Sequence, residues 1–271
     1  NNNSEQKTKT ITIKEKSSDK PITIEINKES NSIIGYTNEN LTNLGYNFLG
    51  YNEQLSNIEI PNVTSIEDDV LANNKGLEKF EAPNLKYIDN GFLTDNEQLS
   101  EFNAPNLEYI WDDFLSCNKE LKRFEAPNLT HVGKYFLCVN EQLSEFNAPN
   151  LEYIGDEFLS CNKELKRFEA LNLTHIDEDF LYDNEQLNEF NAPNLKYIGD
   201  NCLKCNKELK RFEALNLTHI DDGFLNDNEQ LSELYVPNLT KESKERLEYL
   251  FSVVKENSKE GKTQNIDSTD I

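Results

Sequence analysis

The residues that could carry acid–base or metal chemistry are few, and they recur at one fixed distance. All three histidines are 44 residues apart: His131, His175 and His219. If two repeat units separate successive histidines, they stand about 10 Å apart at the ~4.8 Å spacing of stacked strands. That is too far to share one metal ion at about 2.1 Å per bond. We therefore predict a surface row of histidines, with no metal site, no catalytic residue and no enzyme activity.

The cysteines do not form a disulfide framework. Cys117, Cys161 and Cys205 are also 44 residues apart, beyond the roughly 7 Å Cα limit of a disulfide. Cys138 falls one unit from Cys117 and one unit from Cys161, so a bond there stays open, and buried free thiols are the alternative that we favour. Cys202 and Cys205 have CxxC spacing, but a single such pair outside a redox fold is weak evidence.

Both sets of distances come from an internal repeat of 22 residues. Leu99 opens the unit LSEFNAPNLEYIWDDFLSCNKE, and we number the positions of every unit from 1 to 22 by it. Leucine occupies position 1 in eight further units without insertion or deletion: Leu55, Leu77, Leu121, Leu143, Leu165, Leu187, Leu209 and Leu231. Such a period is typical of a solenoid, in which each coil buries its apolar side only by stacking on its neighbours.

The residue types at each position predict the course of one coil. Positions 1, 4 and 6 are apolar and fit a short strand, which the proline at position 7 of most units ends because proline has no N–H. Positions 9 and 12 predict a second short extended segment, and the Phe-Leu pair at positions 16 and 17 predicts a short helical turn. Asparagine fills position 8 in all nine units and position 20 in every complete unit, and its amide can bond the backbone of the next coil.

Set out in this way, the pattern L-x-x-F-x-A-P-N-L-x-x-I-x-x-x-F-L-x-x-N resembles the leucine-rich repeats of the BspA-like class over roughly residues 33–240. The usual unit of that class is one residue longer between the proline and the second strand, and Phe-Leu stands here where Ala-Phe is usual. The resemblance implies a right-handed α/β repeat solenoid, frequently secreted or at the cell surface, which binds proteins or host surfaces. It implies no cofactor and no catalytic residues.

The chain outside the repeat completes the predicted fold class: mostly short parallel β-strands with turns and short helical turns, a β-hairpin cap and a helical cap. The hairpin is predicted from the period-two stretches TKTITIK and PITIEIN, and an unrelated strand pair is the alternative. The helix is predicted from one apolar stripe of Leu247, Leu250, Phe251 and Val254, with Thr240 as its N-cap. The predicted segments are a disordered tail (1–7), the hairpin cap (8–32), the solenoid (33–240), the capping helix (241–256) and a flexible tail or linker (257–271).

The composition narrows the class of partner. Lys and Arg total 27 against 50 Asp and Glu, a formal charge of -23, which disfavours nucleic acid and anionic membranes because their phosphates need basic residues. No stretch approaches the roughly 18 apolar residues of a membrane span. The chain has no methionine, so we expect a processed or trimmed form. The secreted or cell-surface location is what the resemblance implies. We further expect a monomer whose partner is a protein or other macromolecule with a basic surface.

Most of the negative charge falls at positions 13 to 15. Fourteen acidic residues occupy these positions: Glu67, Asp68, Asp69, Asp89, Asp112, Asp113, Asp156, Glu157, Asp177, Glu178, Asp179, Asp200, Asp221 and Asp222. Stacked carboxylates could hold Ca²⁺. The alternative, which we favour, is a solvated acidic edge, because the unit lacks the glycine-rich pattern of calcium-binding β-rolls.

The outward positions of the first strand alternate in charge. Position 3 runs Lys79, Glu101, Arg123, Glu145, Arg167, Glu189, Arg211 and Glu233, and position 5 of the last unit is Tyr235. Because the sign of the charge alternates from one unit to the next, the unit of duplication is 44 residues. Opposite charges on neighbouring strands attract each other. This face is either a self-neutralising row or a docking surface for a partner.

Departures from the repeat are further candidates for a specific contact. Trp111, the single tryptophan, stands at position 13, and Lys134 and Tyr135 replace the acidic pair of the next unit. We expect these three residues to lie together on one edge, either as a binding hot spot or as drift. The sequence thus predicts a non-enzymatic protein-binding or adhesion module that docks a partner on its strand face. A rigid spacer and an intracellular scaffold are the alternatives.

Overall fold

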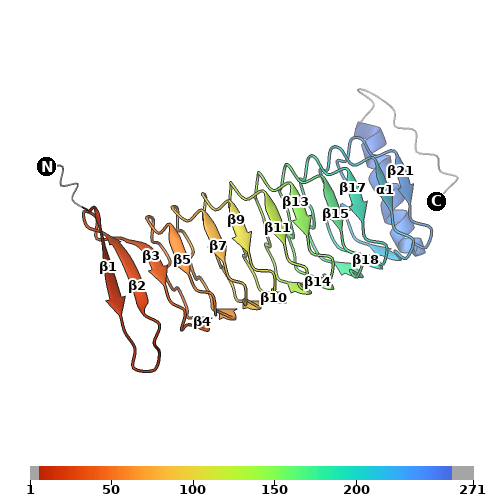
Figure 1. Ribbon diagram of the computed structural model, residues 1–271. Coiled ribbons are helices and arrows are strands. Elements are labelled where there is room, and N and C mark those ends of the chain that lie inside the picture. The colour runs from red at the N-terminus through yellow and green to blue at the C-terminus, as the bar shows by residue number, and fades with distance from the viewer. Residues whose placement is uncertain (1–5, 258–271) are drawn as a thin grey trace.

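The computed structural model describes residues 6–257 and shows an elongated stack of coils (Figure 1). A hairpin of β1 (Thr8–Ile13) and β2 (Ile22–Asn27) stands at the N-terminal end, and helix α1 (Lys241–Asn257) stands at the other. Most of the two tails predicted at 1–7 and 257–271 lies outside the described residues.

Two short strands recur in each coil, at positions 3–5 and 11–12. The first column of strands consists of β3 (Ile33–Thr37), β5 (Asn57–Glu59), β7 (Lys79–Glu81), β9 (Glu101–Asn103), β11 (Arg123–Glu125), β13 (Glu145–Asn147), β15 (Arg167–Glu169), β17 (Glu189–Asn191), β19 (Arg211–Glu213) and β21 (Glu233–Tyr235). The second column consists of β4 (Asn43–Leu44), β6 (Ser65–Ile66), β8 (Tyr87–Ile88), β10 (Tyr109–Ile110), β12 (His131–Val132), β14 (Tyr153–Ile154), β16 (His175–Ile176), β18 (Tyr197–Ile198) and β20 (His219–Ile220). The solenoid strands that pair do so in parallel.

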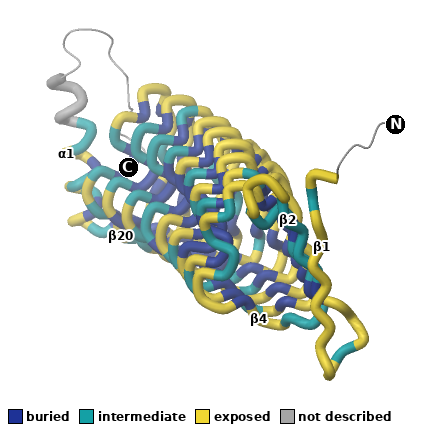
Figure 2. The backbone as a smooth tube through the Cα atoms, turned by 90° about the vertical axis from the view of Figure 1, so that its left-hand side faces the viewer, coloured by how far each residue is buried: buried dark blue, intermediate teal, exposed yellow. Residues whose placement is uncertain are grey.

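The core is a single cluster that runs the length of the stack, with the exposed residues outside it (Figure 2). Phenylalanines stack on their counterparts one coil away, as Phe124 does on Phe146 with ring centroids 5.8 Å apart. Within a coil, Phe124 meets Phe136 edge-on at 5.4 Å. Because each ring packs on others in its own coil and in the next, no coil can be stable alone.

The short helical turn predicted at positions 16 and 17 is wrong. The backbone instead alternates between right- and left-handed conformations, with φ between 50° and 62° at every non-glycine residue of positions 15, 17 and 19. In one coil, the N–H groups of Asp113 and Cys117 donate to the following coil at 2.9 and 3.0 Å, and that of Leu115 donates to the preceding coil at 3.1 Å. A left-handed non-glycine residue costs about 1–2 kcal/mol, and the stacked peptides and the fully buried Leu115 side chain offset that cost.

The first column of strands is hydrogen-bonded only in pairs. Separate two-stranded sheets join β7 to β9, β11 to β13, β15 to β17 and β19 to β21. The second column is continuous from β4 to β14 and again from β16 to β20, with one break between β14 and β16. The 44-residue period of the sequence therefore appears in the backbone as a coil pair.

The two ends are closed differently. At the N-terminal end β1, β2, β3 and β5 form one sheet, whose outermost strand leaves Ile11 and Ile13 exposed. At the C-terminal end the Thr240 hydroxyl accepts the N–H of Ser243, which is the predicted N-cap. The Ser243 hydroxyl then accepts the N–H of Ile220, so α1 completes the open edge of β20.

The predicted apolar stripe of α1 faces the last coil in part. Leu247 is buried, and Phe251 packs against the core cluster while it stays half-buried. The side chain of Val254, the last member of the stripe, lies outside the described residues.

Candidate binding surfaces

The strand face carries its charges in small groups, one for each coil pair. The cation at position 3 lies 3.4–3.7 Å from the glutamate at position 3 of the next coil in all four pairs: Lys79–Glu101, Arg123–Glu145, Arg167–Glu189 and Arg211–Glu233. The same cation also meets the glutamate two residues later on its own strand, as Arg123 meets Glu125 at 2.9 Å. No ion pair joins Glu101 to Arg123 across the gap between pairs. The predicted alternation therefore acts within coil pairs.

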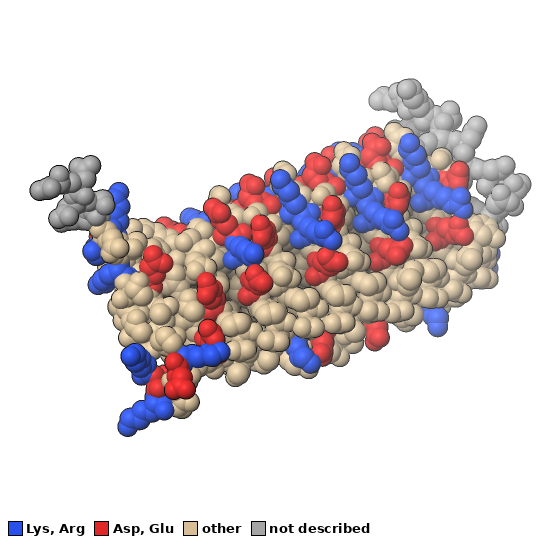
Figure 3. Space-filling view, viewed as in Figure 1, with Lys and Arg blue, Asp and Glu red and all other residues tan. Residues whose placement is uncertain are grey.

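These groups lie in rows on the surface shown in Figure 3. The arginine side chains keep 62–63% of their surface exposed although each holds two carboxylates. Exposed ion pairs stabilise a fold by roughly 0–1 kcal/mol. The ion pairs therefore hold the arginine side chains in place but add little to the stability of the stack. Tyr235 is exposed at the end of the face, on the last strand.

The turn edge, which we define as positions 13 to 19, is the acidic side of the molecule. Some of its carboxylates have a structural use that the sequence did not reveal. The Asp112 side chain accepts the N–H of Lys134 at 2.8 Å, and that of Asp200 accepts the N–H of Asp222 at 2.9 Å, one coil further along in both cases. Position 14 therefore favours Asp and Asn because a short acceptor there links consecutive coils.

Crowding of the carboxylates shifts their protonation. Partial burial, followed by repulsion from neighbouring acids, raises the pKa of Asp89, Asp113 and Glu157. Within residues 6–257, no three His, Cys, Asp or Glu side chains are arranged to hold a metal ion. The carboxylates lie next to one another in the stack without converging on a point.

Trp111, Lys134 and Tyr135 lie on adjacent coils of the turn edge, because the N–H of Asp113 donates to the Lys134 carbonyl. The Trp111 side chain is 58% exposed, and Tyr135 is also exposed. The Lys134 amine is engaged by Asp156 at 2.7 Å. The three residues share an edge, but the described contacts do not bring their side chains together into one cluster.

The histidines belong to a row of rings on the second strand column. His131 lies between Tyr109 and Tyr153, with ring centroids 4.5 and 6.1 Å away, and its Nδ1 is 2.9 Å from the Thr130 hydroxyl. Since the rings cover one another's faces, the row contributes to stacking. The five cysteines are free. The Cys138 thiol donates to the Glu157 carbonyl, and burial raises its pKa to about 12.

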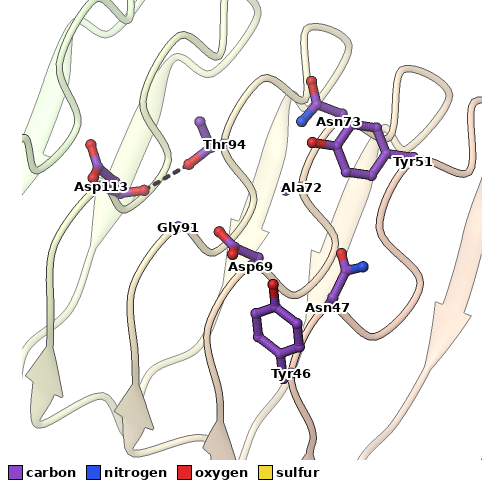
Figure 4. Close-up of a pocket in the computed structure, with 9 residues that line it drawn as sticks. All are labelled: Tyr46, Asn47, Tyr51, Asp69, Ala72, Asn73, Gly91, Thr94 and Asp113. Atoms are coloured by element: carbon purple, nitrogen blue, oxygen red, sulfur yellow. Dashed lines mark hydrogen bonds between the residues drawn. The ribbon is translucent and has the colours of Figure 1, made fainter.

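A shallow hollow of about 300 Å³ lies on the turn edge of the first coils (Figure 4). Tyr46 and Tyr51 stand at its rim, 70% and 71% exposed, and neither has a ring partner among the described residues. The other lining residues are Asn47, Asp69, Ala72, Asn73, Gly91, Thr94 and Asp113. The sequence prediction missed this site, although Tyr46 and Tyr51 are the only aromatic residues at positions 14 and 19.

The match to a family model agrees with the coil architecture. The family model described as a BspA type leucine-rich repeat region, in six copies, matches residues 28–142 and 130–252. No curated protein matches the chain. The crystal structure of a leucine-rich repeat protein from Bacteroides ovatus is similar at 14% identity and a TM-score of 0.44, covering 81% of this chain and 88% of that one.

Members of this family commonly mediate protein interactions and are generally non-enzymatic binding or structural modules. No helix within residues 6–257 has the length and apolar character to cross a bilayer. With the matches spanning nearly all of the coils, the chain belongs to the BspA-type leucine-rich repeat family.

Proposed function

We propose that this protein is a secreted or surface binding module that docks a macromolecular partner on its strand face, with no catalytic role. The observation that carries the proposal is the set of arginines at position 3, Arg123, Arg167 and Arg211. Each is held by two carboxylates, on its own strand and on the next coil. A side chain that is already oriented loses less conformational entropy on binding, and arginine is frequent at binding hot spots.

The regular spacing of the groups supports a partner of extended form. The pairs repeat every two coils, about 10 Å apart at the strand spacing, and every group presents one cation and two carboxylates. A partner with alternating charges in the same register would meet opposite charges along its length. This arrangement favours specificity and association rate over raw affinity.

The test compares charge reversal on the strand face with the same reversal elsewhere. Arg123, Arg167 and Arg211 are replaced together by Glu, and Lys119, Lys163 and Lys207, which lie at position 21, are replaced in a matched control. Proteins from the native environment that the immobilised wild type retains are identified by mass spectrometry. The affinity of the most abundant of them for the wild type and for both variants is then measured by calorimetry. We expect the arginine variant to bind this partner at least about tenfold more weakly, a loss of about 1.4 kcal/mol of binding free energy. The affinity of the lysine control should fall by less than about twofold.

A rigid spacer is the second candidate, because the continuous core and the end caps would suffice for it. If the arginine variant and Trp111→Ala both bind as the wild type does, the spacer is the better description. Equal loss in the arginine variant and the lysine control would point to a diffuse charge effect and contradict docking on the strand face.

A further inference from the structure

Three features together set the hollow at Tyr46 and Tyr51 apart from the other coils of the turn edge. Position 18 holds the small residues Gly50 and Ala72, where later coils carry larger side chains. Position 15 of one lining coil is Gly91, at φ +72°, where a Cβ would collide with the Asp69 carboxylate, and among the described coils only Gly223 is also a glycine at this position. The two tyrosines keep their ring faces free, unlike the rings of the stacked Tyr–His row.

The hollow is negatively charged and therefore favours a cationic ligand. Asp69 and Asp113 line it, and no basic residue does. Beside it, Asp68, Asp112 and Asp95 add further negative charge. Two lysines are near in the sequence: Lys75, two residues after Asn73, is paired with Glu53, and Lys134 is paired with Asp156. A ligand that brings a positive charge would relieve the repulsion between these carboxylates.

We propose that this hollow binds an arginine side chain presented by a basic segment of a protein partner. A planar guanidinium can stack on a tyrosine face and pair with a carboxylate at the same time, which a lysine ammonium does less well. The Asn47 and Asn73 amides can accept the remaining guanidinium N–H groups. A hollow of about 300 Å³ is at the small end for ligand sites, which suits one side chain and excludes a large cofactor.

The site uses none of the strand-face residues, so it stands or fails independently of the function proposed above. The pKa of Asp113 is raised by its partial burial and then by the Asp112 and Asp69 carboxylates. This agrees with a carboxylate that has lost part of its water and faces other acids. A bound cation would reverse that shift.

The test uses an acetylated, amidated Gly-Arg-Gly-Arg-Gly peptide as probe and its citrulline counterpart, which has the same shape without the charge. Binding to the full chain is measured by calorimetry at low ionic strength. We expect the arginine peptide to bind at least about tenfold more tightly than the citrulline peptide. The double variants Tyr46→Ala/Tyr51→Ala and Asp69→Asn/Asp113→Asn should each weaken the arginine peptide by a similar factor.

Two further variants keep the proposal falsifiable. Tyr46→Phe/Tyr51→Phe preserves the ring faces and should retain binding. Glu157→Gln/Asp179→Asn neutralises the same repeat position in coils without the exposed tyrosines and should leave binding within about twofold. Equal binding of the two peptides, or equal loss in this control, would overturn the proposal, as would selective binding of a neutral disaccharide to the hollow.

Discussion

On the strand face every cation of position 3 lies within 3.7 Å of a carboxylate on the next coil, whereas on the turn edge fourteen acidic residues share positions 13 to 15 with one lysine. The two surfaces are made by the same coils. The strand face repeats every 44 residues and offsets part of its negative charge within each coil pair. The turn edge changes from coil to coil and leaves many carboxylates without a cation.

Main-chain hydrogen bonding is the reverse: it is interrupted on the strand face and continuous along the turn edge. Strands of the first column bond only in pairs, while the peptides of positions 15, 17 and 19 bond from coil to coil along the edge. The regular surface thus lies on the less continuous backbone, and the variable surface lies on the more continuous one. Side chains on the turn edge are free to diverge because main-chain bonds and the position-20 asparagines hold that edge together.

Substitutions in the two asparagine columns, positions 20 and 8, should differ most in their effect on the free energy of unfolding. The Asn162 amide donates to the Leu137 and Leu159 carbonyls at 3.0 and 2.7 Å, and its oxygen accepts the Asn140 N–H. Asn162→Ala would leave several buried groups without partners, so we expect a loss of about 3 kcal/mol. Asn150→Ala, at exposed position 8, removes one bond to Pro127 and should cost under about 1 kcal/mol. Urea unfolding checks both, and equal losses would contradict the contrast.

Deleting coils tests whether the pair is the structural unit. Removal of residues 121–142 brings Glu101 opposite Glu145, whereas removal of 121–164 brings it opposite Arg167. We expect the shorter deletion to be less stable by about 1–2 kcal/mol, although it keeps one more coil, because like charges and a mismatched strand pair meet. Denaturant midpoints of the two proteins decide the matter, and a more stable shorter deletion would show that the 22-residue coil is the unit.

The ion pairs of the strand face should contribute little to stability. A double-mutant cycle with Arg167→Ala and Glu189→Ala should give a coupling of about 0.5 kcal/mol at low salt that decreases at high salt. The Lys134–Asp156 pair on the turn edge, at 2.7 Å, is the matched comparison. A coupling several times larger in the first cycle would show that the strand-face rows stabilise the stack.

The smallest expected effect is a pH dependence that arises on the turn edge. The raised pKa of Asp89, Asp113 and Glu157 means that the folded state holds protons more tightly than the unfolded state. Their protonation should therefore stabilise the fold as the pH falls through these raised pKa values, above the ordinary range of Asp and Glu. Below the ordinary range of glutamate, loss of the ion pairs that lower the pKa of Glu108 and Glu185 should reverse the trend.

Calorimetry over this pH range checks the direction of the change in Tm. Asp113→Asn removes one of the contributing carboxyls and suits the left-handed backbone at position 15, so it should raise the Tm at pH 7 by about 1–2 °C. A Tm that falls steadily from pH 7 would contradict the sign.

The period of 22 residues was enough to predict the coil and both strand columns, and the apolar stripe of the helix after the repeat was enough to predict the N-cap at Thr240. It could not predict the conformation of Leu115, because a left-handed leucine is unfavourable by itself and only stacked neighbours stabilise it. The sequence showed the 44-residue alternation of charge, but the pairing of strands by hydrogen bonds depends on backbone geometry. Tyr46 and Tyr51 were missed because they lie in the degenerate first coil, where the repeat fits loosely.

The junction between the coil that begins at Leu143 and the one that begins at Leu165 combines both kinds of break. Neither β13 and β15 nor β14 and β16 are hydrogen-bonded there, while the turn-edge peptides and the Asn162–Asn184 bond still cross it. If the rod bends, this junction is the place where the fewest main-chain bonds oppose bending, and its pivot would lie on the acidic edge. Bending there would widen or narrow the strand face near mid-length, so a long partner could set the curvature of the rod without breaking a strand pair.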